Sequence, residues 1–167
     1  MTTRIFIDGA AGTTGLEIHE RLAARKDLSV IRLAEIERKD SRARACALNE
    51  ADVVILCLPD EAAREAVALI TNPDVRVIDA STAHRVAPGW VFGFAEVEPG
   101  NYAAIAAAKR VSNPGCYSTG FLALVRRPAN FRNSQRTARN IRLKSERTLL
   151  DKPAAVVICL RRKKKKN

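Results

Sequence analysis

Short runs of valine, isoleucine and leucine recur along the first 80 residues, and this recurrence restricts the fold more than any other feature. The runs occupy residues 4–8, 28–36, 52–58 and 75–80. Segments with helical spacing of apolar residues lie between them, at 15–26, 40–49 and 61–70, the last with Asp60 as its expected N-cap. Strands that are apolar throughout are buried on both faces, and intervening helices make them parallel. The sequence therefore predicts an α/β fold with a doubly wound parallel sheet.

A glycine-rich turn follows the first predicted strand and opens the first predicted helix. The glycines are Gly9, Gly12 and Gly15, and Thr13 and Thr14 between them add hydroxyl donors. Glycines at this spacing let a pyrophosphate approach the backbone, and the helix N-terminus offers unpaired N–H groups to it. GxxGxxG is a variant of the dinucleotide fingerprint, and its strand–turn–helix context predicts a Rossmann-type nucleotide-binding domain. The alternative is a glycine-rich turn that binds no nucleotide.

The charges after the second predicted strand bear on which dinucleotide binds. An acidic residue there contacts the ribose hydroxyls of NAD, whereas arginine or lysine favours the 2′-phosphate of NADP. Arg38 and Lys39 fit NADP, and Glu37 fits NAD. The residues favour NADP and leave NAD, or a solvated loop, as alternatives.

Cys116 is the candidate nucleophile. It follows the turn Asn-Pro-Gly at 113–115, and apolar residues with helical character begin at Phe121. The sequence therefore places this thiol at a helix N-terminus, where the helix dipole favours the reactive thiolate. The alternative is a small buried cysteine, which is our interpretation of Cys46, Cys57 and Cys159.

Composition changes abruptly near Arg126. Residues 1–125 contain 14 Lys+Arg and 16 Asp+Glu, a net charge of −2, whereas residues 126–167 contain 15 Lys+Arg and two acidic residues, a net charge of +13. All eight glycines lie at or before Gly120. We therefore divide the chain into a nucleotide-binding domain at 1–125, which ends with the start of the cysteine helix, and a basic, irregular tail at 126–167.

Three blocks of sequence resemble one enzyme family. They are FIDGAAGTTGLEI at 6–18, VIDASTAHRVAPGWVFGFAEVEPG at 77–100 and SNPGCYSTGFLALV at 112–125. Together they resemble the shorter type of N-acetyl-gamma-glutamyl-phosphate reductase, a relative of aspartate-semialdehyde dehydrogenase. The resemblance implies NADPH-dependent conversion of N-acetyl-glutamyl 5-phosphate to N-acetyl-glutamate 5-semialdehyde in arginine biosynthesis. It also implies a homo-oligomer, although the domain that bears the main interface has no counterpart here.

The resemblance also assigns roles to individual residues. Cys116 aligns with the family's nucleophile, whose thiolate attacks the acyl phosphate and forms a thioester that hydride reduces to the aldehyde. The glycine turn with Thr13 and Thr14 matches the nucleotide loop, and Pro59 and Ser81 are expected beside the cofactor. Arg85 is a candidate anion ligand, and His84 is interpreted as a structural loop residue.

The sequence departs from the family in three places. Ser118 and Ala95 each replace a usual proline, and after Val125 the resemblance stops. We expect a truncated chain with weak or absent turnover, because the family's catalytic histidine has no counterpart. A frameshift is our favoured explanation of residues 126–167. The alternatives are a basic tail that binds nucleic acid, which its single aromatic residue does not favour, and a disordered tail.

The compartment and the metal content follow from simpler observations. No segment of residues 1–167 resembles a signal peptide or a membrane span, which predicts a cytoplasmic protein without membrane contact. The four cysteines show no CxxC spacing, and no cysteine or histidine pair has ligand spacing. We therefore expect no disulfide framework and no metal.

Overall fold

The computed structural model describes residues 2–125, and the basic segment at 126–167, with its predicted nucleic-acid alternative and Cys159, lies outside the described residues. In chain order the elements are β1 (Thr3–Asp8), α1 (Thr13–Ala23), β2 (Leu28–Ile31), the 3-10 helix η1 (Glu37–Lys39), α2 (Ser41–Glu50), β3 (Val53–Leu56), α3 (Asp60–Ala68), β4 (Arg76–Asp79), β5 (Val91–Phe92), α4 (Asn101–Ala107), β6 (Arg110–Ser112) and α5 (Cys116–Val125). Within this range no helix has the length and apolar character needed to cross a bilayer.

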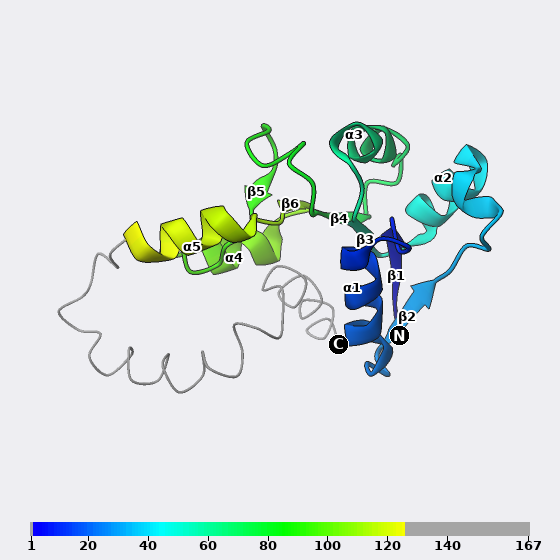
Figure 1. Cartoon of the computed structure of the whole chain (residues 1–167), viewed down its shortest axis with the longest axis horizontal. Helices are drawn as coiled ribbons and strands as arrows, with labels where there is room; N and C mark the ends of the chain where they lie inside the picture. The colour runs from blue at the N-terminus through cyan, green and yellow to red at the C-terminus, as the bar shows by residue number, and fades with distance from the viewer. Residues whose placement is uncertain (1, 126–167) are drawn as a thin grey trace.

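The strands form one parallel sheet, as predicted. Its order is β2-β1-β3-β4-β6-β5, and every neighbouring pair is parallel. In Figure 1 the sheet runs across the view with α2 and α3 above it and α1 and α4 below it. Because the chain leaves β1 for β2 on one side and later adds β3 on the other, the sheet is doubly wound with its switch point between β1 and β3.

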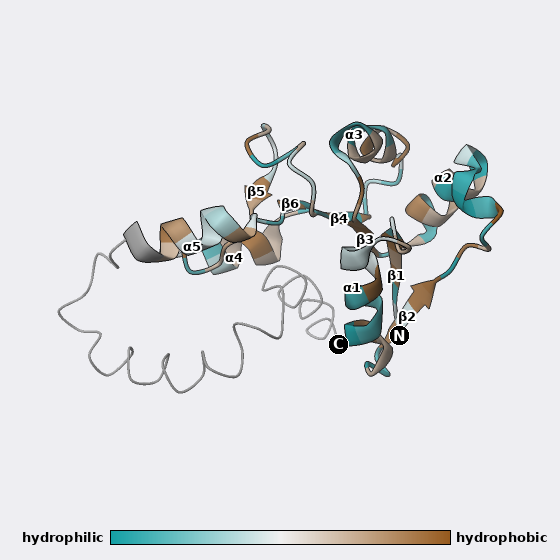
Figure 2. Ribbon diagram, in the orientation of Figure 1, coloured by the Kyte–Doolittle hydropathy of each residue, from teal (hydrophilic) through white to brown (hydrophobic). Residues whose placement is uncertain are grey.

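Two hydrophobic cores fill the spaces between the sheet and its helix layers. Ile5 and Ile7 of β1 belong to the core under α1 and α4, whereas Phe6 between them belongs to the core under α2 and α3. Side chains alternate between the faces of a strand, so a strand that is apolar throughout supplies both cores. Each fully buried isoleucine or leucine contributes about 1.5–3 kcal/mol. Figure 2 shows the hydrophobic colour along β2, β3 and β5, whereas α1 and α2 are largely hydrophilic.

The second strand is shorter than the predicted run of residues 28–36. It ends at Ile31, and the chain then forms a loop and the short helix η1. The Ala34 carbonyl accepts from the N–H groups of Glu37 and Arg38, and the Glu37 carboxylate accepts from the Ala34 N–H at 3.0 Å. Local turn bonds thus replace pairing at this edge of the sheet, because β2 has a neighbouring strand on one side only.

The prediction that Asp60 caps its helix was wrong. The N-cap position of α3 is Pro59, and Asp60 is the first helical residue. The Asp60 carboxylate instead accepts from the backbone N–H of Thr82 at 2.9 Å and from the Thr82 hydroxyl. These bonds, the hydroxyl bond first, hold the pKa of Asp60 below its ordinary value. They also connect the start of α3 to the loop after β4.

Asn49 joins α2 to the segment between α3 and β4. Its amide nitrogen donates to the carbonyls of Ala45 and Leu69, both at 2.8 Å. Its amide oxygen accepts from the backbone N–H groups of Thr71 and Asn72, again at 2.8 Å. An amide is the one neutral side chain that supplies donors and acceptors together at this length, so the residue type is required here.

We expect Asn49→Ala to lower the free energy of unfolding by about 1–3 kcal/mol, because part-buried backbone groups lose their partners. Glu50→Ala is the matched control on the same helix. Its exposed ion pair with Arg4 contributes no more than about 1 kcal/mol. Urea unfolding of both variants measures the difference, and equal losses would contradict this role for Asn49.

Candidate functional site

The candidate site follows the carboxyl edge of the parallel sheet. Gly9 directly follows β1, Pro59 comes shortly after β3, Ser81 after β4, and Cys116 after β6. Since all strands are parallel, these segments leave the sheet at one edge, in the order of the strands. β1 and β6 are three strand spacings apart, about 14 Å. A ligand that reaches both the glycine turn and the cysteine must therefore extend along this edge.

The turn after β1 packs tightly against the end of β3. Gly9 has a φ of +86°, and a Cβ atom built on it lies 2.2 Å from the Cys57 carbonyl oxygen. A Cβ on Gly15 lies 2.4 Å from the Gly9 carbonyl oxygen. Both glycines are therefore required by internal packing: Gly9 for the turn and Gly15 for the approach of α1 to that turn.

Gly12 has no such internal requirement. Its φ is −77°, and the nearest atom to a Cβ built on it is the Gly9 carbonyl oxygen at 3.5 Å, an ordinary contact. It is the N-cap residue of α1, where no side chain caps the helix. Among residues 2–125, the backbone N–H groups of Thr13, Thr14 and Gly15 have no hydrogen-bond acceptor. This helix start can therefore receive an anion, and a side chain at Gly12 would stand in its way.

A cavity of about 490 Å³ lies beside the glycine turn, a size typical of sites for small ligands. Its walls come from the ends of β1 and β2 and from α1, α2 and α3. They include Gly9, Ala10, Leu16, His19, Val30, Arg32, Arg38, Arg44, Leu58 and Ala62. Apolar walls next to a turn with free N–H groups fit an adenosine with its phosphates.

The predicted cofactor residues fall into two groups. Gly9 and Arg38 line the cavity, and Gly12, Thr13, Thr14 and Gly15 form the adjoining helix start. Lys39, Pro59 and Ser81 are not among the residues from 2–125 that line it. A cofactor contact by any of these three stays a prediction.

Two arginines of the cavity wall were missed in the sequence. Arg32 directly follows β2, and Arg44 lies on α2 with its guanidinium against the Asp8 carboxylate, Nη2 to Oδ2 at 2.8 Å. The predicted length of β2 placed residue 32 inside the strand and concealed the first. Nothing in the spacing of Asp8 and Arg44 indicates the second, because their contact arises from the packing of α2 on β1.

Ser81 and His84 belong to a buried network around Asp79. The Ser81 hydroxyl donates to Asp79 Oδ2 at 2.7 Å, and His84 Nδ1 lies 2.6 Å from the same oxygen. The His84 ring stacks on Trp90 with centroids 4.2 Å apart. This geometry agrees with the structural interpretation of His84. Asp79 therefore shapes the loop after β4.

Cys116 begins α5, where the sequence placed it, and its side chain is exposed. The hydroxyls of Ser118 and Thr119 each donate to the Gly115 carbonyl at 2.9 Å, and the Thr119 N–H adds a third bond at 3.0 Å. Ser118, where the resemblance expects a proline, thus bonds within the first turn of α5. Within residues 2–125 the N–H groups of Cys116 and Tyr117 have no acceptor. The thiol lies beside free donors.

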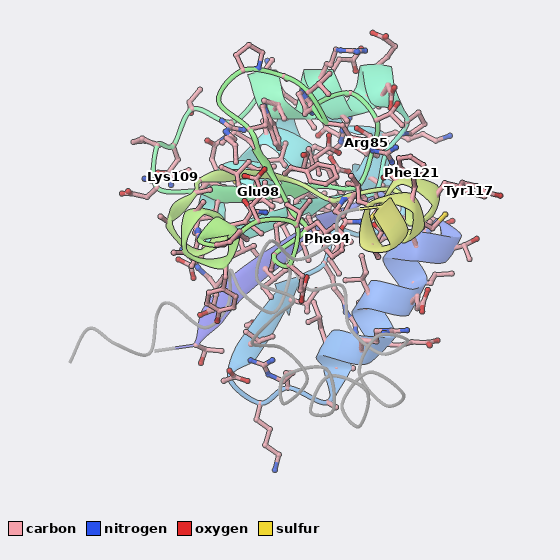
Figure 3. The ribbon with its side chains drawn as sticks, turned by 90° about the vertical axis from the view of Figure 1, so that its left-hand side faces the viewer. Arg85, Phe94, Glu98, Lys109, Tyr117 and Phe121 are labelled. Carbon is pink, nitrogen blue, oxygen red and sulfur yellow. The ribbon has the colours of Figure 1, made fainter. Side chains whose placement is uncertain are left out.

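A guanidinium lies next to this helix start. A Cβ on Gly115 lies 2.9 Å from Arg85 Nη1, so that side chain packs against the residue that precedes Cys116. Arg85 Nε is buried and has no hydrogen-bond partner among the described residues. Figure 3 shows Arg85 near α5, whereas Tyr117 projects away from the rest of the molecule. A positive charge and a thiol thus occur together at the β6 end of the edge.

Cys57 differs chemically from the exposed cysteines. Burial raises the pKa of the Cys57 thiol to about 11, and the nearby carboxylates of Asp79 and Asp8 act in the same direction. This thiol is protonated at neutral pH and is a poor nucleophile. Cys57 is only partly buried, and the side chain of Cys46 is exposed, so the prediction that Cys46 is buried was wrong.

Comparison with known proteins gives a family and several relatives. A family model described as semialdehyde dehydrogenase, NAD binding domain, matches residues 4–105. N-acetyl-gamma-glutamyl-phosphate reductase 2 of Pseudomonas putida is 59% identical over 124 residues, which cover 74% of this chain and 40% of that protein. The N-acetyl-gamma-glutamyl-phosphate reductase of Burkholderia lata is 61% identical over 122 residues, 73% of this chain and 39% of that protein. The chain thus spans about two fifths of the length of these relatives.

Solved structures share the fold. Aspartate semialdehyde dehydrogenase II of Vibrio cholerae, complexed with ASA, superposes with a TM-score of 0.54 at 18% identity, over 73% of this chain and 44% of that one. The same enzyme from Vibrio cholerae in another structure gives a TM-score of 0.51.

The glycine turn generates a stability prediction. Gly9→Ala should lower the free energy of unfolding by at least about 2 kcal/mol, because it adds both a backbone clash and a strained φ. Gly12→Ala should lower it by less than about 1 kcal/mol, the cost of a poorer N-cap. Thermal and urea unfolding of the two variants test this, and similar losses would show that Gly12 also has a packing role.

Proposed function

The chain belongs to the semialdehyde dehydrogenase family through its NAD-binding domain, and from this we propose that it acts in the NADPH-dependent reduction of N-acetyl-glutamyl 5-phosphate to N-acetyl-glutamate 5-semialdehyde. The observation that carries the proposal is the placement of a nucleotide turn and a helix-start cysteine on one edge of one sheet. The names of relatives that are 59% and 61% identical over 124 and 122 residues support it. We further propose residues 1–125 as a nucleotide-binding domain that includes the start of the cysteine helix, and the cytoplasm as its compartment.

A nicotinamide dinucleotide fits the residues present. The N–H groups of Thr13, Thr14 and Gly15 would hold its pyrophosphate, and the open side of Gly12 leaves room for that approach. The apolar walls beside Leu58 would bury the adenosine. When bound, the dinucleotide supplies the hydride for the reduction.

The cysteine and Arg85 would carry the acyl-transfer step. The Cys116 thiolate attacks the acyl carbon, the bond from that carbon to the phosphate oxygen breaks, and inorganic phosphate leaves, so that a thioester remains on Sγ. Free N–H groups at the start of α5 stabilise the thiolate. The unpaired Arg85 guanidinium beside Gly115 suits the dianionic leaving group. The hydride that a bound dinucleotide would supply would reduce this thioester, and release of the aldehyde would return Cys116 Sγ to the thiolate.

Neither histidine of the chain is placed to transfer the accompanying proton. His84 is buried against Asp79 and Trp90, and His19 lies on α1 at the nucleotide cavity. General acid–base assistance is worth about 10²–10⁴-fold. The covalent step at Cys116 and cofactor binding can each be measured without turnover, and the tests below use them.

For the cofactor, we propose NADP rather than NAD. Arg38 lines the cavity, and Lys39 is its neighbour in η1. Glu37, the residue that favours NAD, has its carboxylate on the Ala34 N–H. The positive charges of Arg38 and Lys39 support binding of a 2′-phosphate here. The Glu37 carboxylate already accepts a hydrogen bond from the Ala34 N–H.

Cofactor binding gives the first test. Gly12→Asp places a carboxylate where the pyrophosphate would lie, so we expect the affinity of the full chain for NADPH to fall at least about 100-fold. Gly12→Ala, which adds no charge, should cause a smaller loss. Fluorescence titration measures both, with circular dichroism as the control for folding. An unchanged dissociation constant in Gly12→Asp would contradict nucleotide binding at this turn.

Selective alkylation gives the second test. We expect iodoacetamide at neutral pH to label Cys116 first, Cys46 next, and Cys57 at least about tenfold more slowly because of its raised pKa. Cys46 is the matched control, since its thiol is also exposed. Peptide mass mapping over time gives the three rates. If Cys46 and Cys116 react equally fast, the activated nucleophile is disproved.

A further inference from the structure

The arginines of the nucleotide cavity carry an inference that rests on the proposed function and refines it. We propose that Arg44, held in place by Asp8, is the residue that distinguishes a 2′-phosphorylated dinucleotide from an unphosphorylated one, and that Arg32 and Arg38 complete the phosphate site. The two residues named for this role in the sequence were Arg38 and Lys39. The geometry points instead to three guanidinium groups: Arg32 after β2, Arg38 on η1 and Arg44 on α2.

Arg44 has the firmest position of the three. Its Nη2 lies 2.8 Å and its Nε 3.3 Å from Asp8 Oδ2, and the two side chains are only 17% and 9% exposed. A guanidinium has five N–H donors, and these two bonds use two of them. Within residues 2–125 the remaining donors of Arg44 have no acceptor. The Arg44 guanidinium is thus held by Asp8 on one side, and its remaining N–H donors can bind an anion in the cavity.

The charge of the cavity wall matches one phosphate monoester. Arg32, Arg38 and Arg44 contribute three positive charges, and Asp8 contributes one negative charge. The net charge of these four side chains is about +2. It is similar in size and opposite in sign to the charge of a phosphate monoester near neutral pH, about −1.5 to −2.

Two other arginines of the cavity wall have no ion pair among the described residues. Arg4, Arg21, Arg25 and Arg64 form ion pairs with carboxylates elsewhere on the surface. By contrast, the side chains of Arg32 and Arg38 have neither a hydrogen bond nor an ion pair within the described residues, although both line the same concave wall as Arg44. Two free guanidinium groups beside an anchored one fit a phosphate, which accepts several charge-assisted hydrogen bonds at once.

A competing explanation is that Arg44 only neutralises the buried carboxylate of Asp8. The two explanations differ in their effect on ligand selectivity. If Arg44 merely supports Asp8, its removal disturbs the cavity for every nucleotide alike. If it binds the 2′-phosphate, its removal weakens only ligands that carry this group.

The test compares 2′,5′-ADP with 5′-AMP by calorimetry on the full chain. These fragments share the adenosine 5′-phosphate and differ in the 2′-phosphate. We expect Arg44→Gln to weaken 2′,5′-ADP about 10- to 100-fold and to change 5′-AMP by less than about twofold. Arg42→Gln, which removes an exposed arginine of α2 outside the cavity wall, is the matched control and should change neither.

The outcomes distinguish failure of the Arg44 assignment from failure of nucleotide binding. Equal weakening of both ligands in Arg44→Gln, or no weakening of 2′,5′-ADP, overturns the inference while nucleotide binding stands. A wild-type chain that binds both ligands equally well does the same. If the wild type binds neither ligand, the proposed function fails and the inference fails with it. If Arg44→Gln does not fold, two other variants replace it. The double variant Asp8→Asn, Arg44→Gln removes both charges of the ion pair, whereas Arg38→Gln keeps the pair intact. Each is expected to lose affinity for 2′,5′-ADP and to keep its affinity for 5′-AMP.

Discussion

The carbonyl oxygen of Cys57 fills the position that a Cβ atom on Gly9 would occupy. The arrangement of the carboxyl edge of the sheet depends on this close contact between Gly9 and Cys57. The contact brings the turn after β1 against the end of β3, which is the switch point of the sheet. Gly15 then brings α1 against the same turn. Because the N-terminus of α1 follows from these two close approaches, the position of its free N–H groups is set by backbone packing and needs no ligand to form.

A second set of interactions orders the other half of the edge. Asp79 holds Ser81 and His84 in the loop after β4, and Asp60 at the start of α3 holds Thr82 in the same loop. The loop is therefore held from two sides, by the buried Asp79 carboxylate and by the partly exposed Asp60 carboxylate. Arg85 follows these residues directly, so its place beside Gly115 depends on a loop that the two carboxylates hold in shape.

The sequence predicted what periodicity and glycine spacing determine. The four strands of the first 80 residues, the parallel sheet, the glycine turn and the helix start at Cys116 all follow from local pattern, and the structure has them. Side-chain partnerships between distant segments were not predictable. Asp60 was expected to be an N-cap, yet its carboxylate accepts hydrogen bonds from Thr82, 22 residues later. The Asp8–Arg44 pair spans 36 residues and arises only when α2 packs on the sheet. Edge strands also end earlier than apolar runs indicate, as β2 does at Ile31.

The order of the strands separates two kinds of chemistry along one edge. The arginines of the cavity wall belong to the β1, β2 and α2 region, whereas Arg85 and Cys116 follow β4 and β6. Strands β1 and β6 lie three strand spacings apart, about 14 Å. Substitutions at sites this far apart, with no shared partner, have additive effects on free energy. The cavity wall and the segment around Cys116 can therefore change independently in the course of evolution. Substitutions around α2 would alter the cavity without requiring a compensating change at the cysteine.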